Sequence, residues 1–335
     1  MKIAQSLCKA WLCECWTTMN STPAALNSTT VEPNDCYPEL NLNIYFFILH
    51  LIIILIGIPC NAFSLFVSYQ HIKQNNELGV YLLNLALSDF LFIAGLPLWM
   101  DFELNDNWHY GKTLCTVWIF FLFTNFYSSA LLLSCISVDR YFAVVHPLSF
   151  PFLRKPSTAA TVSVAVWTFT LMFNAITIDP NQIYDDTYKV CLDVFPLTSK
   201  QIKVYVVRFF VGFLLPAVVV MFCYWRICRE VCTNQATGLS ERRRVFRLLG
   251  TVLLSLCLCF GPVHITMVLR AGLENCLPPA WLYLLYKAAV ALAMFNCLAD
   301  PLLYCFITRR GRTSVTQAFM FCKSKEYFKQ RSTDI

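Results

Sequence analysis

Seven long apolar stretches, separated by short polar segments, constrain this chain more than any other feature of its sequence. An α-helix needs about 20 mainly apolar residues to cross a bilayer, and it satisfies its own backbone hydrogen bonds there. Only 14% of the residues are charged, against about 25% in a typical soluble domain. The sequence therefore predicts an all-α membrane protein, a seven-transmembrane helix bundle, with spans at residues 42–69, 80–100, 114–145, 158–178, 204–228, 246–269 and 280–306.

Polar segments flank the predicted bundle of residues 42–306 on both sides. Residues 1–41 predict a polar tail without the long apolar core of a secretory signal, and Met19 is an alternative start to Met1. Residues 307–335 predict a short amphipathic helix, at 309–321, and a further tail. Cys322 directly follows that helix beside two lysines, so we expect it to be palmitoylated, the alternative being a free thiol.

Charged residues divide between the two sides of the predicted bundle. Lys and Arg gather on one side, which includes the run Arg242-Arg243-Arg244, whereas Asp and Glu gather on the other. The positive-inside rule makes the basic side cytoplasmic and the N-terminus extracellular. The glycosylation sequons at Asn20 and Asn27 agree with this orientation. We expect a multi-pass plasma-membrane glycoprotein. Nucleic acid is not an expected partner, because the basic residues lie in short loops beside apolar spans.

Most of the 17 cysteines lie inside apolar runs, where a free cysteine acts as a small buried hydrophobe. Four fall on the predicted outer side, in an oxidising compartment where two disulfides are expected. Spacing alone leaves three connectivities open for these four. They are Cys36, Cys115, Cys191 and Cys276.

Polar residues inside the spans are costly and usually functional. Neutral amides are compatible with plain hydrogen bonding between helices, but two buried carboxylates need a partner or a proton. We therefore expect one buried polar site that holds a proton, or a cation such as Na⁺, near Asp89. The polar residues that could converge there are Asn61, Asn84, Asp89, Ser129, Asn296 and Asp300.

Other functional classes find no support in the sequence. Catalytic or zinc-ligand spacing is absent on both predicted faces, so we expect no enzyme, no cofactor and no other metal site. Inverted repeats and paired broken helices, which are typical of transporters, are also absent.

At its cytoplasmic end the third span carries Asp139-Arg140-Tyr141, an acid beside an arginine that can hold the arginine back until a partner competes for it. Further motifs along the chain are Gly57-x-x-x-Asn61, Asn84-Leu85-Ala86-Leu87-Ser88-Asp89, Trp108, Cys115 with Cys191, Trp167, Pro216 with Tyr224, Cys259-Phe260-Gly261-Pro262 and Asp300-Pro301-x-x-Tyr304. Through all of these motifs, residues 42–321 resemble the rhodopsin-like, or class A, G-protein-coupled receptors.

The resemblance implies a receptor that activates heterotrimeric G proteins, with arrestin and receptor kinases as further partners. It implies a Cys115–Cys191 disulfide, which leaves Cys36 to pair with Cys276. It also implies that Phe260 is a switch below the ligand pocket and that two prolines kink their helices. The residues assigned to G-protein activation are Asp139, Arg140, Tyr141, Tyr224, Phe260, Pro262, Pro301 and Tyr304.

A closer resemblance is to the proton-sensing subfamily, of the T-cell death-associated (psychosine-receptor-like) type. It implies a response to extracellular acid through Gs and cyclic AMP. The stretches that carry it include Asn76-Glu77-Leu78-Gly79-Val80-Tyr81-Leu82, Leu96-Pro97-Leu98-Trp99, Asn125-Phe126-Tyr127-Ser128-Ser129 and Asn296-Cys297-Leu298-Ala299-Asp300-Pro301.

Two features depart from the proton-sensing pattern. Of five histidines, only His50, His109 and His264 can face the outer side, fewer than the subfamily carries. Thr170 stands where relatives have a buried Glu in the fourth span. Acid sensing would then rest on the buried polar site around Asp89 and on these three histidines.

An anionic lipid, such as a lysolipid, is the alternative ligand. Arg208, Arg270 and Lys287 lie in the outer parts of the last three spans, and a buried arginine needs a carboxylate or phosphate partner. Internal partners such as Asp193 or Glu274 would satisfy them instead.

Overall fold

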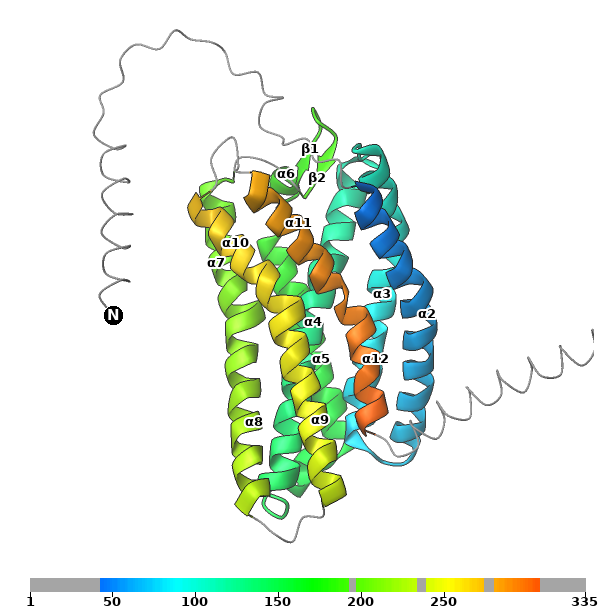
Figure 1. Ribbon diagram of the computed structural model, residues 1–335, viewed down its shortest axis with the longest axis vertical. Helices are drawn as coiled ribbons and strands as arrows, with labels where there is room; N and C mark the ends of the chain where they lie inside the picture. The colour runs from blue at the N-terminus through cyan, green and yellow to red at the C-terminus, as the bar shows by residue number, and fades with distance from the viewer. Residues whose placement is uncertain (1–42, 193–196, 234–238, 274–279, 308–335) are drawn as a thin grey trace, which may run out of the picture. The chain divides into compact units, whose positions relative to one another are not determined.

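The computed structural model describes residues 43–192, 197–233, 239–273 and 280–307 (Figure 1). Within these residues, seven helical segments are long and apolar enough to cross a membrane, which confirms the predicted seven-helix bundle. The spans are α2 (Asn43–Lys73), α3 (Glu77–Asn105), α4 (Gly111–Val145), α5 (Pro156–Thr177), α7–η3–α8 (Ser199–Phe209, Phe210–Leu214, Leu215–Thr233), α9–η4–α10 (Leu239–Ser255, Leu256–Phe260, Gly261–Leu273) and α11–α12 (Ala280–Met294, Asn296–Ile307).

Short elements connect the spans. The 3-10 helix η2 (Pro151–Arg154) precedes α5, and α6 (Pro180–Ile183) leads into the two-residue strands β1 (Tyr184–Asp185) and β2 (Val190–Cys191). The strands are antiparallel, with Tyr184 opposite Cys191. We call the end of the bundle that holds these strands the disulfide end, and the end where α2 meets α3 the opposite end.

Several helices are longer than the apolar runs that predicted them. The helix α3 begins at Glu77 rather than near residue 80, because the Asn76 side chain accepts a hydrogen bond from the Leu78 backbone N–H. This cap satisfies one of the free N–H groups of the first turn. Hydropathy detects only the part of a helix that lies in hydrocarbon, so polar end turns were missed.

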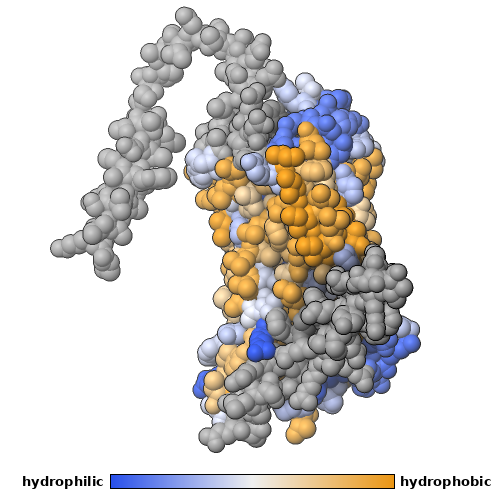
Figure 2. Space-filling model, turned by 45° about the vertical axis from the view of Figure 1, so that its right-hand side comes forward, coloured by the Kyte–Doolittle hydropathy of each residue, from blue (hydrophilic) through white to orange (hydrophobic). Residues whose placement is uncertain are grey.

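The faces of the bundle separate lipid contact from internal packing. On the face shown in Figure 2, a hydrophobic band crosses the middle of the bundle and most hydrophilic residues lie toward its two ends. The central helix is α4, whose most apolar stretch is the most buried of the seven. Large apolar side chains that face outward include Leu55, Phe66, Val164, Ile176 and Trp225.

Two π-helical turns interrupt the spans directly before prolines. η3 precedes Pro216 and η4 precedes Pro262. Proline lacks an N–H and its ring crowds the carbonyl four residues earlier, so the regular hydrogen-bond ladder cannot continue through it. In each case the residue before the proline donates to the carbonyl five residues back, from Leu215 to Phe210 and from Gly261 to Leu256. The kink predicted at Pro262 is thus accompanied by a π-turn that the sequence did not indicate.

Gly95 on α3 makes room for a buried tryptophan of α4. A Cβ at Gly95 would lie 2.4 Å from Trp118 Cζ3, and Trp118 itself stacks on Phe92 at 5.4 Å. We expect Gly95→Ala to destabilise the protein by about 1–3 kcal/mol, because the indole cannot move within a packed core. The measurement is the thermal unfolding midpoint of the detergent-purified protein. The matched control is Gly250→Ala, where a Cβ meets nothing within 4 Å; equal midpoints for the two variants would contradict the prediction.

Candidate functional site: polar groups inside the bundle

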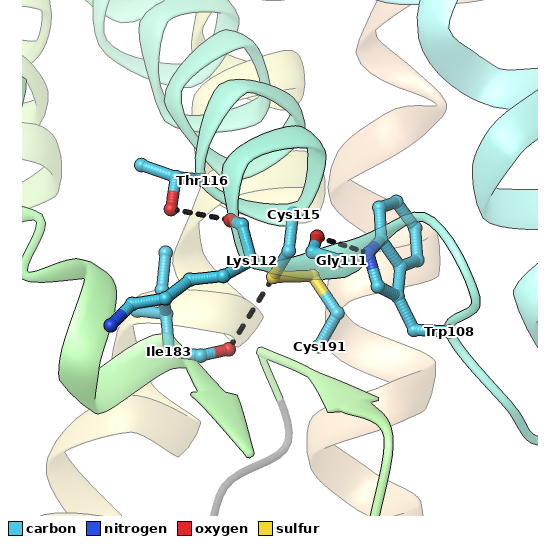
Figure 3. The surroundings of a disulfide bond; sticks show 7 residues. All are labelled: Trp108, Gly111, Lys112, Cys115, Thr116, Ile183 and Cys191. Atoms are coloured by element: carbon cyan, nitrogen blue, oxygen red, sulfur yellow. Dashed lines mark hydrogen bonds between the residues drawn. A yellow bond between two sulfur atoms is a disulfide. The ribbon is translucent and has the colours of Figure 1, made fainter. Parts of the chain in front are cut away.

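A disulfide fixes the loop of β1 and β2 to the first turn of α4 (Figure 3). Cys115 bonds Cys191 of β2, with a Cα–Cα distance of 5.8 Å, so the predicted pair is confirmed. Cys115 Sγ also lies 3.5 Å from the Ile183 carbonyl oxygen; this is a contact only, because a disulfide sulfur carries no hydrogen to donate. Nearby, the indole Nε1 of Trp108 donates to the Gly111 carbonyl at 2.9 Å.

The other sites predicted on the tails and loops lie outside the described residues: Cys36, Cys276, Asn20, Asn27, Cys322 and the helix at 309–321.

Asp89 lies fully buried in the middle of α3. It accepts a hydrogen bond from Asn125 Nδ2 of α4 at 3.0 Å. Its other oxygen, Oδ2, has no hydrogen-bond partner among the described residues. No ion pair among the described residues includes Asp89. The carboxylate is therefore removed from water with little to compensate a negative charge.

Asp300 of α12 lies close enough to Asp89 for the two carboxylates to repel one another. Its Oδ2 accepts a hydrogen bond from Asn296 Nδ2 at 2.7 Å, whereas Oδ1 has no hydrogen-bond partner among the described residues. Asn61 of α2 reaches the same place and donates to the Cys297 carbonyl at 2.9 Å. The structure thus brings α2, α3, α4 and α12 together near two buried acids, with Asn61, Asn296 and the two acids as predicted and Asn125 as the residue from α4.

Two of the six predicted polar residues do not bond within this cluster. Asn84 instead accepts a hydrogen bond from the Trp167 indole of α5 at 2.9 Å, which is plain interhelical bonding. Ser129 is fully buried, but its hydroxyl has no partner among the described residues. Three polar side chains that were not predicted also belong here: Asn125, Ser88 and Ser128, of which the two serines share a 2.6 Å hydrogen bond. Each of the three lies in a motif used only to recognise the family.

Thr170 of α5 is the position where the sequence departs from the buried Glu of the proton-sensing pattern. The residue is fully buried, and its hydroxyl has no hydrogen-bond partner in the described part of the chain. The polar residue one turn later, Asn174, donates to Thr124 of α4 at 3.0 Å. No described hydrogen bond joins these groups to Asp89 or Asp300, so the buried acids form a cluster of two.

At the opposite end, Arg140 is held by two carboxylates. Its Nε donates to Asp139 at 2.8 Å, as the sequence predicted, and a second nitrogen bonds both Asp139 and Glu77 of α3, the latter at 2.9 Å. Asp139 and Glu77 are both buried. The contact with Glu77 was missed because it joins residues 63 positions apart.

We expect Glu77→Gln to raise G-protein signalling in the absence of stimulus. The substitution removes one of the two charges that hold Arg140, so the conformation with a free arginine becomes more populated. Loss of about 1 kcal/mol corresponds to a rise of about fivefold in basal signal. The measurement is basal nucleotide exchange at matched surface expression. Glu230→Gln on α8 is the control, because Glu230 makes no ion pair among the described residues; the same basal signal in both variants would exclude the restraint.

Of the other residues predicted to act in G-protein activation, Phe260 lies in the buried core and several others are partly buried. Phe260 is fully buried in η4 and packs edge-on against Phe126, with 6.0 Å between ring centroids. Tyr141 bonds His146 at 3.1 Å, and Tyr141 and Tyr224 both pack against the small buried cluster that includes Ile227. Pro301 lies inside α12. The Tyr304 side chain is not among the described ones.

The three candidate histidines are in different surroundings. His50 Nδ1 lies 2.8 Å from Glu103 Oε2, with both side chains buried. His109 lies 3.2 Å from Asp101 but is half exposed, so water screens that pair. His264 Nδ1 lies 2.7 Å from the Phe260 carbonyl oxygen, and its ring stacks against Phe213. These three residues do not converge on one site.

Exposed acids at the disulfide end are held in their charged form. The hydrogen bond from the Lys200 ammonium keeps the pKa of Asp179 below its usual range, and the bond from Lys189 does the same for Asp186. A carboxyl with a lowered pKa stays ionised from pH 5.5 to 8. These two acids therefore do not titrate in the range of extracellular acidification.

The basic residues proposed for an anionic ligand do not line one common cavity. Arg208 of α7 is buried, lies 3.6 Å above the Phe123 ring and donates to the Thr177 hydroxyl at 3.1 Å. It lines a cavity beneath the loop that holds α6 and the two strands. Lys287 of α11 lines a different cavity, and Arg270 stacks on the Tyr286 ring at 4.2 Å. Asp193 and Glu274, their possible internal partners, lie outside the described residues.

Comparison with known proteins agrees with this arrangement. Residues 60–304 match the family model described as 7 transmembrane receptor (rhodopsin family). The chain is 37% identical to G-protein coupled receptor 65 of Homo sapiens over 322 residues, 91% of this chain and 94% of that protein. It is 35% identical to G-protein coupled receptor 68 of Homo sapiens over 285 residues, 82% and 78%. It is also 30% identical to lysophosphatidic acid receptor 6 of Gallus gallus over 275 residues, 76% and 87%.

Proposed function

Because this chain belongs to the rhodopsin family of seven-transmembrane receptors, we propose that it senses extracellular protons and passes the signal to a heterotrimeric G protein. Membership confirms the class predicted from the sequence, and it makes the chain a multi-pass plasma-membrane receptor rather than an enzyme. The N-terminus and the disulfide end face outward in this proposal, following the positive-inside rule. Gs with cyclic AMP is the proposed output, and arrestin and receptor kinases are the further proposed partners.

The observation that carries the proposal is the pair of buried carboxylates, Asp89 and Asp300. They come from different helices and lie close together, with no cation bonded to either among the described residues. Two such groups cannot both stay charged in a dry interior without help. A shared proton is the simplest remedy, and Na⁺ is the alternative occupant.

Protonation of this pair can change the receptor's conformation. A proton removes the repulsion between the two carboxylates, so it favours the state in which α3 and α12 hold them closest. We assign that closest approach to the active state. Acid then activates the receptor, and the signal falls as rising pH removes the shared proton. Because Thr170 replaces an acid found in the proton-sensing subfamily, the response is expected to be shallower than in those receptors.

A lysolipid is the second candidate ligand, and one observation favours it. The Arg208 guanidinium is buried beside a cavity, and its only hydrogen bond among the described residues goes to a neutral hydroxyl. A phosphate or carboxylate headgroup would satisfy it better. One relative, lysophosphatidic acid receptor 6, is named for such a ligand.

The test is a cyclic AMP and calcium measurement in cells expressing the receptor, with external pH varied from 8 to 5.5 and no ligand added. Untransfected cells are the control. The proposal expects a rise as the pH falls. A flat wild-type response, together with activation by an added lysolipid at constant pH, would overturn it in favour of the second candidate.

A further inference from the structure

His50 and Glu103 form a buried acid–base pair between α2 and α3, near the disulfide end. The two side chains are 1% and 7% exposed, and His50 Nδ1 lies 2.8 Å from Glu103 Oε2. The other carboxylate oxygen accepts a hydrogen bond from the Trp99 indole at 3.1 Å. Each carboxylate oxygen of Glu103 therefore has a polar partner inside the bundle.

A small cavity lies against this pair and brings in a third charged group. His50, Trp99 and Glu103 line it together with Lys287 and Tyr286 of α11 and with Leu192 of the outer loop. His50 Nε2 is buried and has no hydrogen-bond partner among the described residues. The cavity holds about 10 Å³, roughly the space of one water molecule. An organic ligand cannot enter it, but a proton can.

We propose that His50, Glu103 and Lys287 form a second proton-binding site. At neutral pH the charge of Lys287 balances that of Glu103, and in acid the protonated His50 takes over this role. This inference rests on the proposed acid-sensing function and names a further site for it. Lys287 is the cation that lines this cavity with Glu103 among the described residues, and its ammonium lies 5.1 Å from the Tyr283 ring. Protonation converts the hydrogen bond between His50 and Glu103 into an ion pair. The carboxylate then needs Lys287 less, and the two cations repel one another across the cavity.

The charge transfer moves helices relative to one another. His50 and Glu103 tie α2 to α3 more tightly once the imidazole is charged, whereas Lys287 belongs to α11, which leads into the Asp300 helix α12. Acid therefore loosens α11 from the first two spans at the same time as it protonates the buried carboxylates deeper in the bundle. Tyr286 is the other titratable side chain that lines the cavity. α12 contributes none to it, its acid Asp300 lying with Asp89.

The test uses three substitutions, two of which should move the pH midpoint of the response in opposite directions. Cyclic AMP is measured against external pH for full-length variants at matched surface expression. Glu103→Gln removes the charge that stabilises protonated His50, so the midpoint should move to lower pH by about 1 unit. Lys287→Met removes the competing cation, so the midpoint should move to higher pH by roughly half a unit. His50→Gln should make the curve shallower and abolish the effect of a second change at Lys287.

The exposed pair of His109 and Asp101 provides the matched control. Its 3.2 Å contact is also between an imidazole and a carboxylate, but water screens it. His109→Gln should move the midpoint by less than about 0.2 unit. If wild type responds to acid but Glu103→Gln and Lys287→Met leave the midpoint unchanged or move it in the same direction, the second site is excluded. A flat wild-type curve would instead overturn the proposed function itself.

Discussion

Cys115→Ala is expected to remove the receptor from the cell surface and abolish its response. The Cys115–Cys191 bond joins α4, the central helix, to β2, across 76 positions of sequence. Closing a loop of that length is worth about 4 kcal/mol in the chain-entropy model. That figure is an upper value here, because α5 remains inserted in the membrane and shortens the free loop. Even half of it is a large share of a typical folding free energy.

The loop held by this bond also covers the interior. Leu192, directly after β2, lines two cavities at the disulfide end, one beside Arg208 and the other beside His50. Without the bond, water would enter both places and screen their charges. We therefore expect the variant protein that does reach the surface to signal poorly.

Surface labelling and the acid response measure these two effects separately. Cys191→Ala should behave like Cys115→Ala, and the double variant should be no worse than either, because all three remove one bond. Cys257→Ala is the control, since Cys257 is a free, outward-facing cysteine of η4. Normal surface level and normal response in Cys115→Ala would show that the bond has no structural role.

The helices and the buried acids could be predicted because their signals are local. A span needs a continuous apolar run, and a carboxylate inside such a run stands out against it. Asp89 and Asp300 were found in this way, and so was the charge pair of Asp139 with Arg140. The same reasoning put Asn84 in the wrong place. An amide has many possible partners, and Asn84 donates to the Val80 carbonyl of its own helix and accepts from the Trp167 indole.

The missed residues depend on contacts between distant parts of the chain. Glu77 looks like an ordinary first-turn acid until α4 brings Arg140 to it. Glu103 lies beyond the apolar run that marked the second span, so it was read as one of many outer acids, yet folding buries it against His50. The three basic residues were grouped by depth alone. Their separation into different cavities follows from which face of each helix they occupy, and a single sequence with irregular π-turns does not give that face reliably.

Asp300→Asn should imitate the acid-activated receptor at neutral pH. An amide has the shape of a protonated carboxyl but no charge, so it removes the repulsion that Asp89 meets at this position. Its oxygen can still accept the hydrogen bond from Asn296, which lies at 2.7 Å in the native protein. Its N–H₂ group can occupy the place of Oδ1, which has no partner among the described residues, and donate toward Asp89. The packing of α12 against α3 is therefore kept while the charge is removed.

The expected result is high basal cyclic AMP at pH 8 and a pH response reduced by about fivefold or more, the equivalent of about 1 kcal/mol. Acid favours the active state only through groups that gain a proton on activation, and this substitution removes one of them. The pH response that remains in Asp300→Asn should come from His50 and Glu103, so adding His50→Gln should flatten the curve of cyclic AMP against pH further. Asp101→Asn is the control, because Asp101 is partly exposed and bonds Tyr110 and His109 at the disulfide end. A full, unshifted pH response in Asp300→Asn would mean that protons act elsewhere, and the His50 site would then be the first to examine, since it alone among the three histidines pairs with a buried carboxylate in the described part of the chain.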